Sequence, residues 1–214
     1  MEASDEVLVG RIQAGDARAF EALVRRHQDR IFSVAYRILG DPADAEEAAS
    51  AAFVKVFQRA ATYDPRWKVS TWLGRVVANC CVDHYRRRLR QGRRPDPPPD
   101  ESDGRAGPEE DYALAERRRL LQEALLALPL ETRLALGLRY GQGLSVAEVA
   151  RARGMGEEAV KGHLKRGKAA LRKRYPKVNI SLHQGTPEQV ARLVREDVAE
   201  VGLATESLSK FEDL

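Results

Sequence analysis

Residues 145–164 constrain the fold of this chain more than any other segment. Ser145 and Glu148, three positions apart, form the pattern of a capping box at the start of a helix. Gly154 follows, and glycine readily adopts the left-handed backbone that a tight turn after a helix needs. The spacing therefore predicts a helix-turn-helix, and the apolar seam between its two helices is expected from Val149, Val160 and Leu164.

The second helix of this motif is strongly basic. A cationic helix of this kind suits the DNA major groove, which is bordered by phosphates. The alternative interpretation is an ordinary helical hairpin with a solvated basic face. Because a capped first helix, a turn glycine and a basic second helix coincide, the segment favours DNA binding. The side chains expected to contact DNA here are Lys161, His163, Lys165, Arg166, Lys168 and Arg172.

Composition favours an all-α fold built from two small helical domains. The chain has 214 residues, of which 43% are hydrophobic and 6% aromatic, and runs of β-branched residues are absent before the C-terminal tail. No stretch approaches the roughly 20 apolar residues of a membrane span, so no membrane insertion is expected. A signal peptide is not expected either, because the N-terminus is acidic.

Cysteine usage and the pattern of reactive side chains argue against several kinds of site. Cys80 and Cys81 are adjacent, which disfavours a normal disulfide and fits reduced thiols in the cytoplasm. No Cys/His cluster at ligand spacing appears, so no metal and no cofactor are expected. No nucleophile–base pair and no phosphate-binding loop appear either. We therefore expect a protein that is not an enzyme.

Charge divides the chain into segments. Residues 1–95 hold 17 Lys and Arg against 12 Asp and Glu, and residues 114–175 hold 14 against 6. Residues 96–113, rich in proline, hold one basic residue against seven acidic ones. We therefore expect two basic domains, a pattern that attracts phosphate backbones, joined by a linker. The expected units are domain 1–94, linker 95–111, domain 112–176 and C-terminal extension 177–214.

Cap and turn residues divide the N-terminal domain into four expected helices. The first ends near Gly15, and Asp16 then caps a second that ends at Gly40. The third begins with Pro42, whose missing N–H costs nothing in a first helical turn. The fourth begins near Ser70 and ends in a run of three arginines.

The C-terminal extension has a pattern of its own. Residues 178–182 alternate like a strand, and residues 186–201 follow the spacing of an amphipathic helix. A lone strand is not stable by itself. We therefore expect a regulatory or partner-binding element here.

Two sets of motifs stand in order around the linker. The first domain contains Asp44-Ala45-Glu46-Glu47 before Phe53-Val54-Lys55, then Ser70-Thr71-Trp72-Leu73, Arg75-Val76-Val77 and Asn79. The second contains Leu128-Pro129, Arg133, Tyr140, Gly143-Leu144-Ser145, Glu148-Val149-Ala150, Val160-Lys161 and Leu164. Together, over about residues 5–175, these motifs resemble the sigma-70 family and within it the small two-domain extracytoplasmic-function (ECF) group.

The resemblance implies a subunit that binds the RNA polymerase core and directs it to promoters. It implies contacts with the β′ clamp and the β flap, promoter DNA as a ligand, and an anti-sigma factor as a partner. The second domain, with the basic helix described above, would read the minus-thirty-five element. The residues implied in polymerase binding are Asp44, Glu46, Glu47, Ser50 and Phe53.

The first domain would recognise and melt the minus-ten element. Melting takes a base out of the stack, which is favourable only if a pocket or an aromatic face receives it. We expect Trp72 to pack in the core. Asn79 lies in an apolar stretch of helix, where a buried amide would need partners, so we expect it to offer its amide to a base edge. The residues implied in minus-ten contacts are Tyr63, Trp67, Lys68, Ser70, Arg75, Asn79, Arg86 and Arg87.

The sequence departs from the family pattern at a few positions. Ser50 and Ala51 stand where the family usually has a glutamine and an acid that help dock the polymerase clamp. In the recognition helix, Ala159 and Gly162 stand where threonine and serine are common. Glycine inside a helix costs about 1 kcal/mol relative to alanine.

These departures leave two other functions open. One is a sigma-like decoy that sequesters an anti-sigma factor without directing transcription. The other is a stand-alone helix-turn-helix repressor, which would leave the first domain unexplained.

Overall fold

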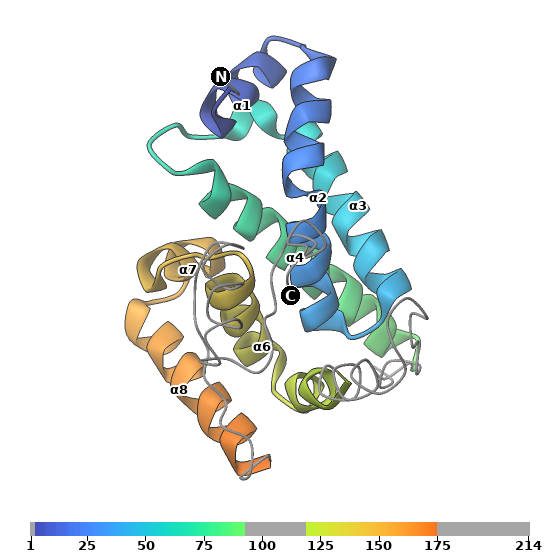
Figure 1. Cartoon of the computed structure of the whole chain (residues 1–214), viewed down its shortest axis with the longest axis vertical. Helices are drawn as coiled ribbons and strands as arrows, with labels where there is room; N and C mark the ends of the chain where they lie inside the picture. Colours follow the sequence, from blue (N-terminus) through green and yellow to red (C-terminus); the bar gives the residue numbers. More distant parts are fainter. Residues whose placement is uncertain (1–2, 93–118, 175–214) are drawn as a thin grey trace, which may run out of the picture.

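The computed structural model describes residues 3–92 and 119–174, and these residues form helices and turns (Figure 1). The all-α fold predicted from composition is confirmed. The expected linker 95–111 lies outside the described residues. The strand and the helix expected after residue 177 also lie outside them.

The first two helices begin and end where the sequence predicts. Helix α1 spans Asp5–Gln13, and α2 spans Ala17–Leu39. The Asp16 carboxylate caps α2 by accepting hydrogen bonds from the backbone N–H groups of its first turn, at 2.9 and 3.2 Å. Gly40, with a φ of 86°, ends it in the left-handed conformation.

The third and fourth helices complete the N-terminal unit. Helix α3 spans Pro42–Gln58, a short turn η1 spans Ala60–Thr62, and α4 spans Val69–Arg90. The predicted start at Pro42 is confirmed, because Asp41 caps the helix through the Asp44 amide at 2.9 Å. Helices α2, α3 and α4 pack against one another in turn.

The second unit contains the helix-turn-helix. Residues 119–126 are helical, and α6 follows at Leu130–Leu136. It runs into η2, a π-helical turn over Gly137–Gly141, a form that the sequence did not suggest. Helix α7 spans Val146–Arg153 and α8 spans Glu157–Arg174.

The motif is confirmed in detail. The Ser145 hydroxyl accepts from the Glu148 amide at 3.2 Å, and the Glu148 carboxylate accepts from the Ser145 amide at 2.7 Å. Gly154 has a φ of 65° and turns the chain into α8. The predicted seam residues Val149, Val160 and Leu164 are all buried.

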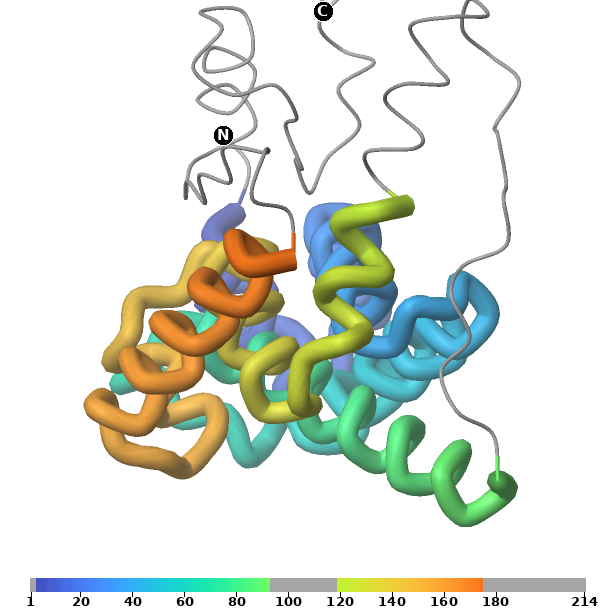
Figure 2. The backbone as a smooth tube through the Cα atoms, turned by 90° about the horizontal axis from the view of Figure 1, so that it is seen from below, coloured from blue at the N-terminus to red at the C-terminus, as the bar shows by residue number. Residues whose placement is uncertain are grey.

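The two units pack directly on each other. Helix α4 lies against α7, and η2 lies against α2 (Figure 1). From below, the helical segment 119–126 runs beside the end of α2 (Figure 2), where Leu126 fills the space over Gly40. The buried apolar residues of both units form one cluster. Composition had suggested separate small cores, so this shared core is a correction to that expectation.

Among residues 3–92 and 119–174, no helix is both long enough and apolar enough to cross a bilayer.

Candidate nucleic-acid interface

The outer face of α8 carries the basic side chains expected to contact DNA. Lys161, Lys165, Arg166 and Arg172 are exposed. Lys161 Nζ forms an ion pair with Glu158 Oε1 at 2.6 Å, one turn earlier in the helix. This pair raises the pKa of Lys161, so the side chain remains a cation. The face therefore presents positive charge at a helix-turn-helix position suited to a groove.

Two of the predicted α8 residues are held partly against the protein. His163 Nδ1 lies 3.1 Å from Thr132 Oγ1 of α6. Lys168 Nζ lies 5.3 Å from the ring centroid of Tyr140, a cation–π contact. Both side chains are half-buried, so they orient the helix as well as bordering its exposed face.

A second predicted surface lies on the loop before α4 and on the first half of that helix. Trp67 is 42% exposed, and Lys68, Arg75 and Asn79 are exposed as well. Asn79, whose amide was expected to meet a base edge, faces outward from α4 between buried residues. An exposed amide and an exposed indole on one surface are the groups that an unstacked base requires.

Tyr63 lies under this loop instead of on its surface. Its ring is buried, with its centroid 5.3 Å from that of Trp72, and its hydroxyl donates to the backbone oxygen of Trp67 at 2.6 Å. Burial and the nearby carboxylates raise the pKa of Tyr63. The predicted packing role of Trp72 fits this contact. Tyr63 and the half-buried Ser70 thus support the loop that presents Trp67.

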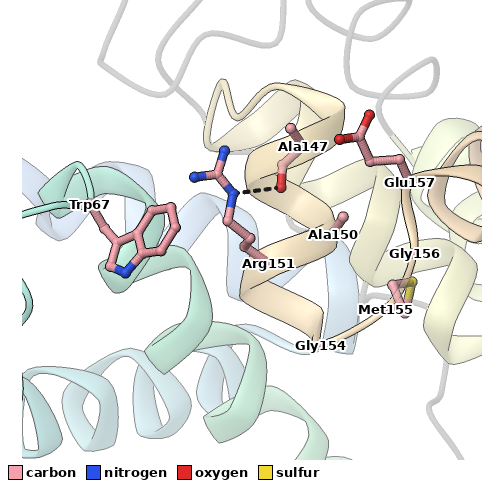
Figure 3. A pocket seen from close by; sticks show the side chains of 8 residues that line it. All are labelled: Trp67, Ala147, Ala150, Arg151, Gly154, Met155, Gly156 and Glu157. Atoms are coloured by element: carbon pink, nitrogen blue, oxygen red, sulfur yellow. Dashed lines mark hydrogen bonds between the residues drawn. The ribbon is translucent and has the colours of Figure 1, made fainter.

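Helix α7 of the second unit covers part of this surface. The Arg151 guanidinium carbon lies 4.6 Å from the ring centroid of Trp67. Lys68 Nζ lies 3.1 Å from Glu148 Oε1, and Arg153 donates to Asn79 Oδ1 at 3.4 Å. Figure 3 shows Trp67 and α7 on facing sides of a pocket. The pocket is lined by Trp67, Ala147, Ala150, Arg151, Gly154, Met155, Gly156 and Glu157.

The residues predicted to bind polymerase divide into two groups. Asp44 pairs with His84 at 2.9 Å and with Arg88, and Glu47 pairs with Arg87. These two carboxylates therefore hold α3 to the end of α4. The other group lies outside these pairs: Glu46 and Ser50 are exposed and Phe53 is half-buried.

Two arginines near the end of α4 differ in their ion pairing. Arg87 is engaged by Glu47, whereas the neighbouring Arg86 is exposed. Within the part of the chain that the structure describes, no ion pair of Arg86 is present. Arg86 and Arg87 were both predicted to contact DNA, and Arg86 is the one of the two without an ion pair among the described residues.

Glu148 has the most altered acidity near this surface. Burial would raise the pKa of its carboxyl. The opposing hydrogen bonds from the Ser145 amide and hydroxyl and the charge of Lys68 lower the pKa to about 2. Glu148 is therefore a carboxylate at any ordinary pH, and it links the helix cap to the first unit.

This altered acidity predicts a pH dependence of stability. The folded pKa of Glu148, about 2, lies below the ordinary value of 4.5, so its contribution is complete above pH 4.5 and is lost as the pH falls toward 2. We expect Glu148→Gln to lower the free energy of unfolding by about 1 kcal/mol at neutral pH, because glutamine can keep the bond to the Ser145 amide but lacks the charge that attracts Lys68 and the helix N-terminus. Denaturant unfolding at several pH values measures this free energy. As the pH falls from 4.5 toward 2, the free energy of unfolding should decrease less in the variant than in the wild type. An equal decrease in both proteins would contradict the prediction.

Sequence reasoning missed the polar contacts between the units. Arg133, 3% exposed, donates to the backbone oxygen of Ile38, and its guanidinium carbon lies 5.2 Å from the Tyr85 ring centroid. Burial lowers the pKa of Arg133. Gln122 Nε2 donates to the Tyr36 backbone oxygen at 2.9 Å. An arginine inside an apolar helix was the available signal, because such a charge needs a buried partner.

Two family models match the chain. The sigma-70 region 2 model matches residues 23–91, which include α3 and α4. The sigma-70 region 4 model matches residues 118–171, which include the helix-turn-helix.

Curated relatives match across both units. The ECF RNA polymerase sigma factor SigM of Mycobacterium tuberculosis (strain H37Rv) is 32% identical over 176 residues, which are 79% of this chain and 84% of SigM. The ECF RNA polymerase sigma factor SigW of Bacillus subtilis is 29% identical over 187 residues, 81% of this chain and 97% of SigW. The ECF RNA polymerase sigma-E factor of Escherichia coli K12 is 31% identical over 160 residues, 69% of this chain and 81% of that factor.

Solved structures share the arrangement of helices. CnrH, in complex with the cytosolic domain of CnrY, superposes with a TM-score of 0.60 at 26% identity, covering 79% of this chain and 95% of CnrH. The sigma factor RpoE of Bartonella quintana, in complex with the anti-sigma factor NepR, superposes with a TM-score of 0.61 at 18% identity, covering 77% of this chain and 100% of RpoE. The second likeness concerns the fold alone.

Proposed function

The chain belongs to the sigma-70 family, in its extracytoplasmic-function group, and from this premise we propose that it binds the RNA polymerase core and directs it to promoters. The observation that carries the proposal is the presence of two separate surfaces suited to DNA on the two matched units. One is the basic face of α8, and the other is the loop and helix that present Trp67 and Asn79. Its place of action would be the cytoplasm, where promoter DNA and polymerase meet.

The two surfaces suit different forms of DNA. The α8 face, with Lys165 and Arg166, suits the major groove and the phosphates of an intact duplex at the minus-thirty-five element. An exposed tryptophan beside an exposed amide suits an unstacked base, which is the product of melting at the minus-ten element. Arg86 would hold a phosphate beside that base.

Polymerase docking would use the exposed side of α3. Asp44 and Glu47 are engaged in ion pairs within the unit, so we assign docking to Glu46, Ser50 and Phe53. The exposed apolar side chains of Val54 and Phe57 continue this surface. An apolar centre with a charged neighbour is a common composition for an interface with a large partner.

An anti-sigma factor is the second partner that we propose. RpoE of Bartonella quintana is known in complex with one, and its fold is similar to this one. A decoy that only sequesters such a partner is the competing function, favoured by Ser50 and Ala51 at the docking surface. A decoy has no need for an exposed basic α8, which argues for the promoter-directing role.

Transcription with core polymerase tests the proposal. We expect core polymerase with the purified chain to produce run-off transcripts from a genomic promoter library. The double variant Arg166→Glu, Lys168→Glu should bind duplex promoter DNA about tenfold more weakly or worse. The salt slope of binding should fall by about two, roughly one for each lost phosphate contact. The measurements are transcript yield and duplex affinity against salt concentration.

A matched variant controls for charge alone. Arg18→Glu with Arg25→Glu makes the same charge change on α2 and should leave the salt slope of duplex binding unchanged. No transcript from any template with folded protein would reject the promoter-directing function. If the protein also failed to bind core polymerase but bound a helical anti-sigma protein tightly, the decoy function would be the better explanation.

A further inference from the structure

The Arg166 guanidinium is folded back along α8 toward the start of that helix. Its Nη2 lies 3.3 Å from Nδ1 of His163, three residues earlier. A Cβ on Gly162, four residues earlier, would lie 3.2 Å from its Nη1. Helical side chains point toward the N-terminus, and the lack of a side chain at Gly162 leaves room for the guanidinium over that turn. The charged group is thus presented about one helical turn before its own residue.

His163 is itself held in place by the neighbouring helix. Its Nδ1 lies 3.1 Å from Oγ1 of Thr132, a residue of α6 that is 3% exposed. Gly167 allows this approach, because a Cβ there would lie 3.0 Å from Thr132 Cγ2. A guanidinium only donates hydrogen bonds, so Nδ1 accepts from Arg166 and the proton of the neutral ring is on Nε2. The half-buried ring therefore offers Arg166 an acceptor at a position fixed by α6.

The other exposed cations of this face lack such support. Among residues 3–92 and 119–174, neither Lys165 nor Arg172 forms an ion pair, and both are exposed. Lys161 pairs with Glu158, but both side chains of that pair are exposed. A cation without a fixed orientation supplies affinity for the phosphates of any sequence, whereas reading a base edge requires one orientation. Of these cations, Arg166 is therefore the one suited to sequence readout.

The direction of the Arg166 side chain matters because of how a recognition helix lies on DNA. In a helix-turn-helix, residues near the N-terminus of the second helix contact base edges in the major groove. Helix α8 begins at Glu157, so a guanidinium over Gly162 lies in the second turn, although Arg166 itself belongs to the third. At that level an arginine can bind O6 and N7 of guanine together, which distinguishes guanine from the other bases.

We propose that Gly162 and His163 position Arg166 to read a guanine in the duplex that α8 binds. Arg166 is then a specificity-determining residue and His163 a positioning residue, while Lys165 and Arg172 add affinity without preference. The proposal rests on the function proposed above and names what gives its upstream duplex site a sequence preference. It also gives a role to a glycine at the position where the family pattern commonly has serine.

Selection from a duplex library tests the reading role. The full chain is mixed with duplexes that carry about ten consecutive random base pairs, one turn of DNA, and the bound fraction is sequenced. We expect the wild type to enrich guanine at one position about tenfold or more, as for a bidentate arginine–guanine contact, and Arg166→Ala to lose that preference. Lys165→Ala is the matched control: it removes a neighbouring cation and should weaken binding to all sequences equally while the preference remains.

Three variants separate positioning from reading. Gly162→Ala places a methyl group against the Arg166 guanidinium, and His163→Ala removes its acceptor. Each should reduce the guanine preference about threefold or more, as for one lost hydrogen bond. His163→Asn should retain the preference, because the asparagine Oδ1 can accept at about the position of Nδ1. Gly10→Ala, where nothing lies within 4 Å of the Cβ position, is the control for a glycine change and should have no effect.

Each outcome decides a separate point. No base preference in the wild type, or a preference that Arg166→Ala keeps, would overturn the reading role of Arg166. A preference kept by Gly162→Ala or by His163→Ala would overturn the positioning role of that residue. Equal losses in His163→Asn and His163→Ala would show that the ring acts through packing and would overturn its role as an acceptor.

Two further measurements keep these results separate from other failures. Circular dichroism shows whether each variant is folded, and if His163→Ala is not, Gly162→Ala decides, because a helix gains stability when alanine replaces glycine. Failure of the promoter-directing function would appear as an absence of transcripts with core polymerase while the guanine preference and its loss in the variants remain.

Discussion

Asp44→Ala is expected to lower the free energy of unfolding by about 3 kcal/mol, measured by denaturant titration. The Asp44 carboxylate, with 18% of its side chain exposed, lies between His84 and Arg88, whose side chains are 6% and 14% exposed. Removing it takes from Arg88 and His84 the carboxylate that they share, and leaves His84 with the more distant Glu47 carboxylate at 3.7 Å. Removing one partner of a largely buried pair costs more than the net value of the pair, which is why the expected effect is large.

A neighbouring acid provides the control. Glu46→Ala removes the same charge from the same helix but from an exposed position, and the change should remain within about 0.5 kcal/mol. Polymerase affinity should respond in the opposite order, with the larger loss for the Glu46 variant among proteins that remain folded. Similar stability losses for both variants would show that the Asp44 pairs do not hold α3 to α4.

Gly167→Val is the second large expected effect, a loss of about 2 kcal/mol in the free energy of unfolding. A Cβ at Gly167 would lie 2.9 Å from Leu136 Cδ1 and 3.0 Å from Thr132 Cγ2, both on α6. Valine adds two methyl groups beyond that position and would push α8 away from α6. Thermal unfolding followed by circular dichroism measures the loss.

Gly162, in the same helix, should respond in the opposite direction. The atoms nearest to a Cβ there belong to the Arg166 guanidinium, the closest at 3.2 Å, and that flexible group can move aside. Gly162→Ala should therefore stabilise the protein by about 0.5–1 kcal/mol through helix propensity. If both glycine variants destabilised equally, the close approach of α8 and α6 would not explain the first result.

Local signals in the sequence predicted the helices well. The residues that begin or end a helix are Asp16, Gly40 and Pro42. Each interacts with backbone groups a few positions away, so its effect does not depend on the rest of the fold. The capping box at Ser145 and the turn at Gly154 are of the same kind. Such features could be placed from sequence because the interaction and its partner lie one helical turn apart.

Contacts between distant segments could not be placed in this way. The pairing of Asp44 with Arg88 removed an acid from the predicted docking surface, and the burial of Tyr63 removed a ring from the predicted DNA surface. The contact of Arg133 with Ile38 joins residues of both units, and no periodicity reports it.

The π-helical turn at Gly137–Gly141 has a consequence for how insertions and deletions would act on this chain. Its widened backbone bond, from the Gln142 amide to the Gly137 oxygen at 3.0 Å, accommodates one residue more than an α-helical turn. Deleting a single residue there would restore ordinary winding and rotate everything downstream by about 100°. The direction of α7 and α8, the helices proposed to read DNA, thus depends on the chain length of one short stretch. A change of length there would redirect them more than most changes of side chain.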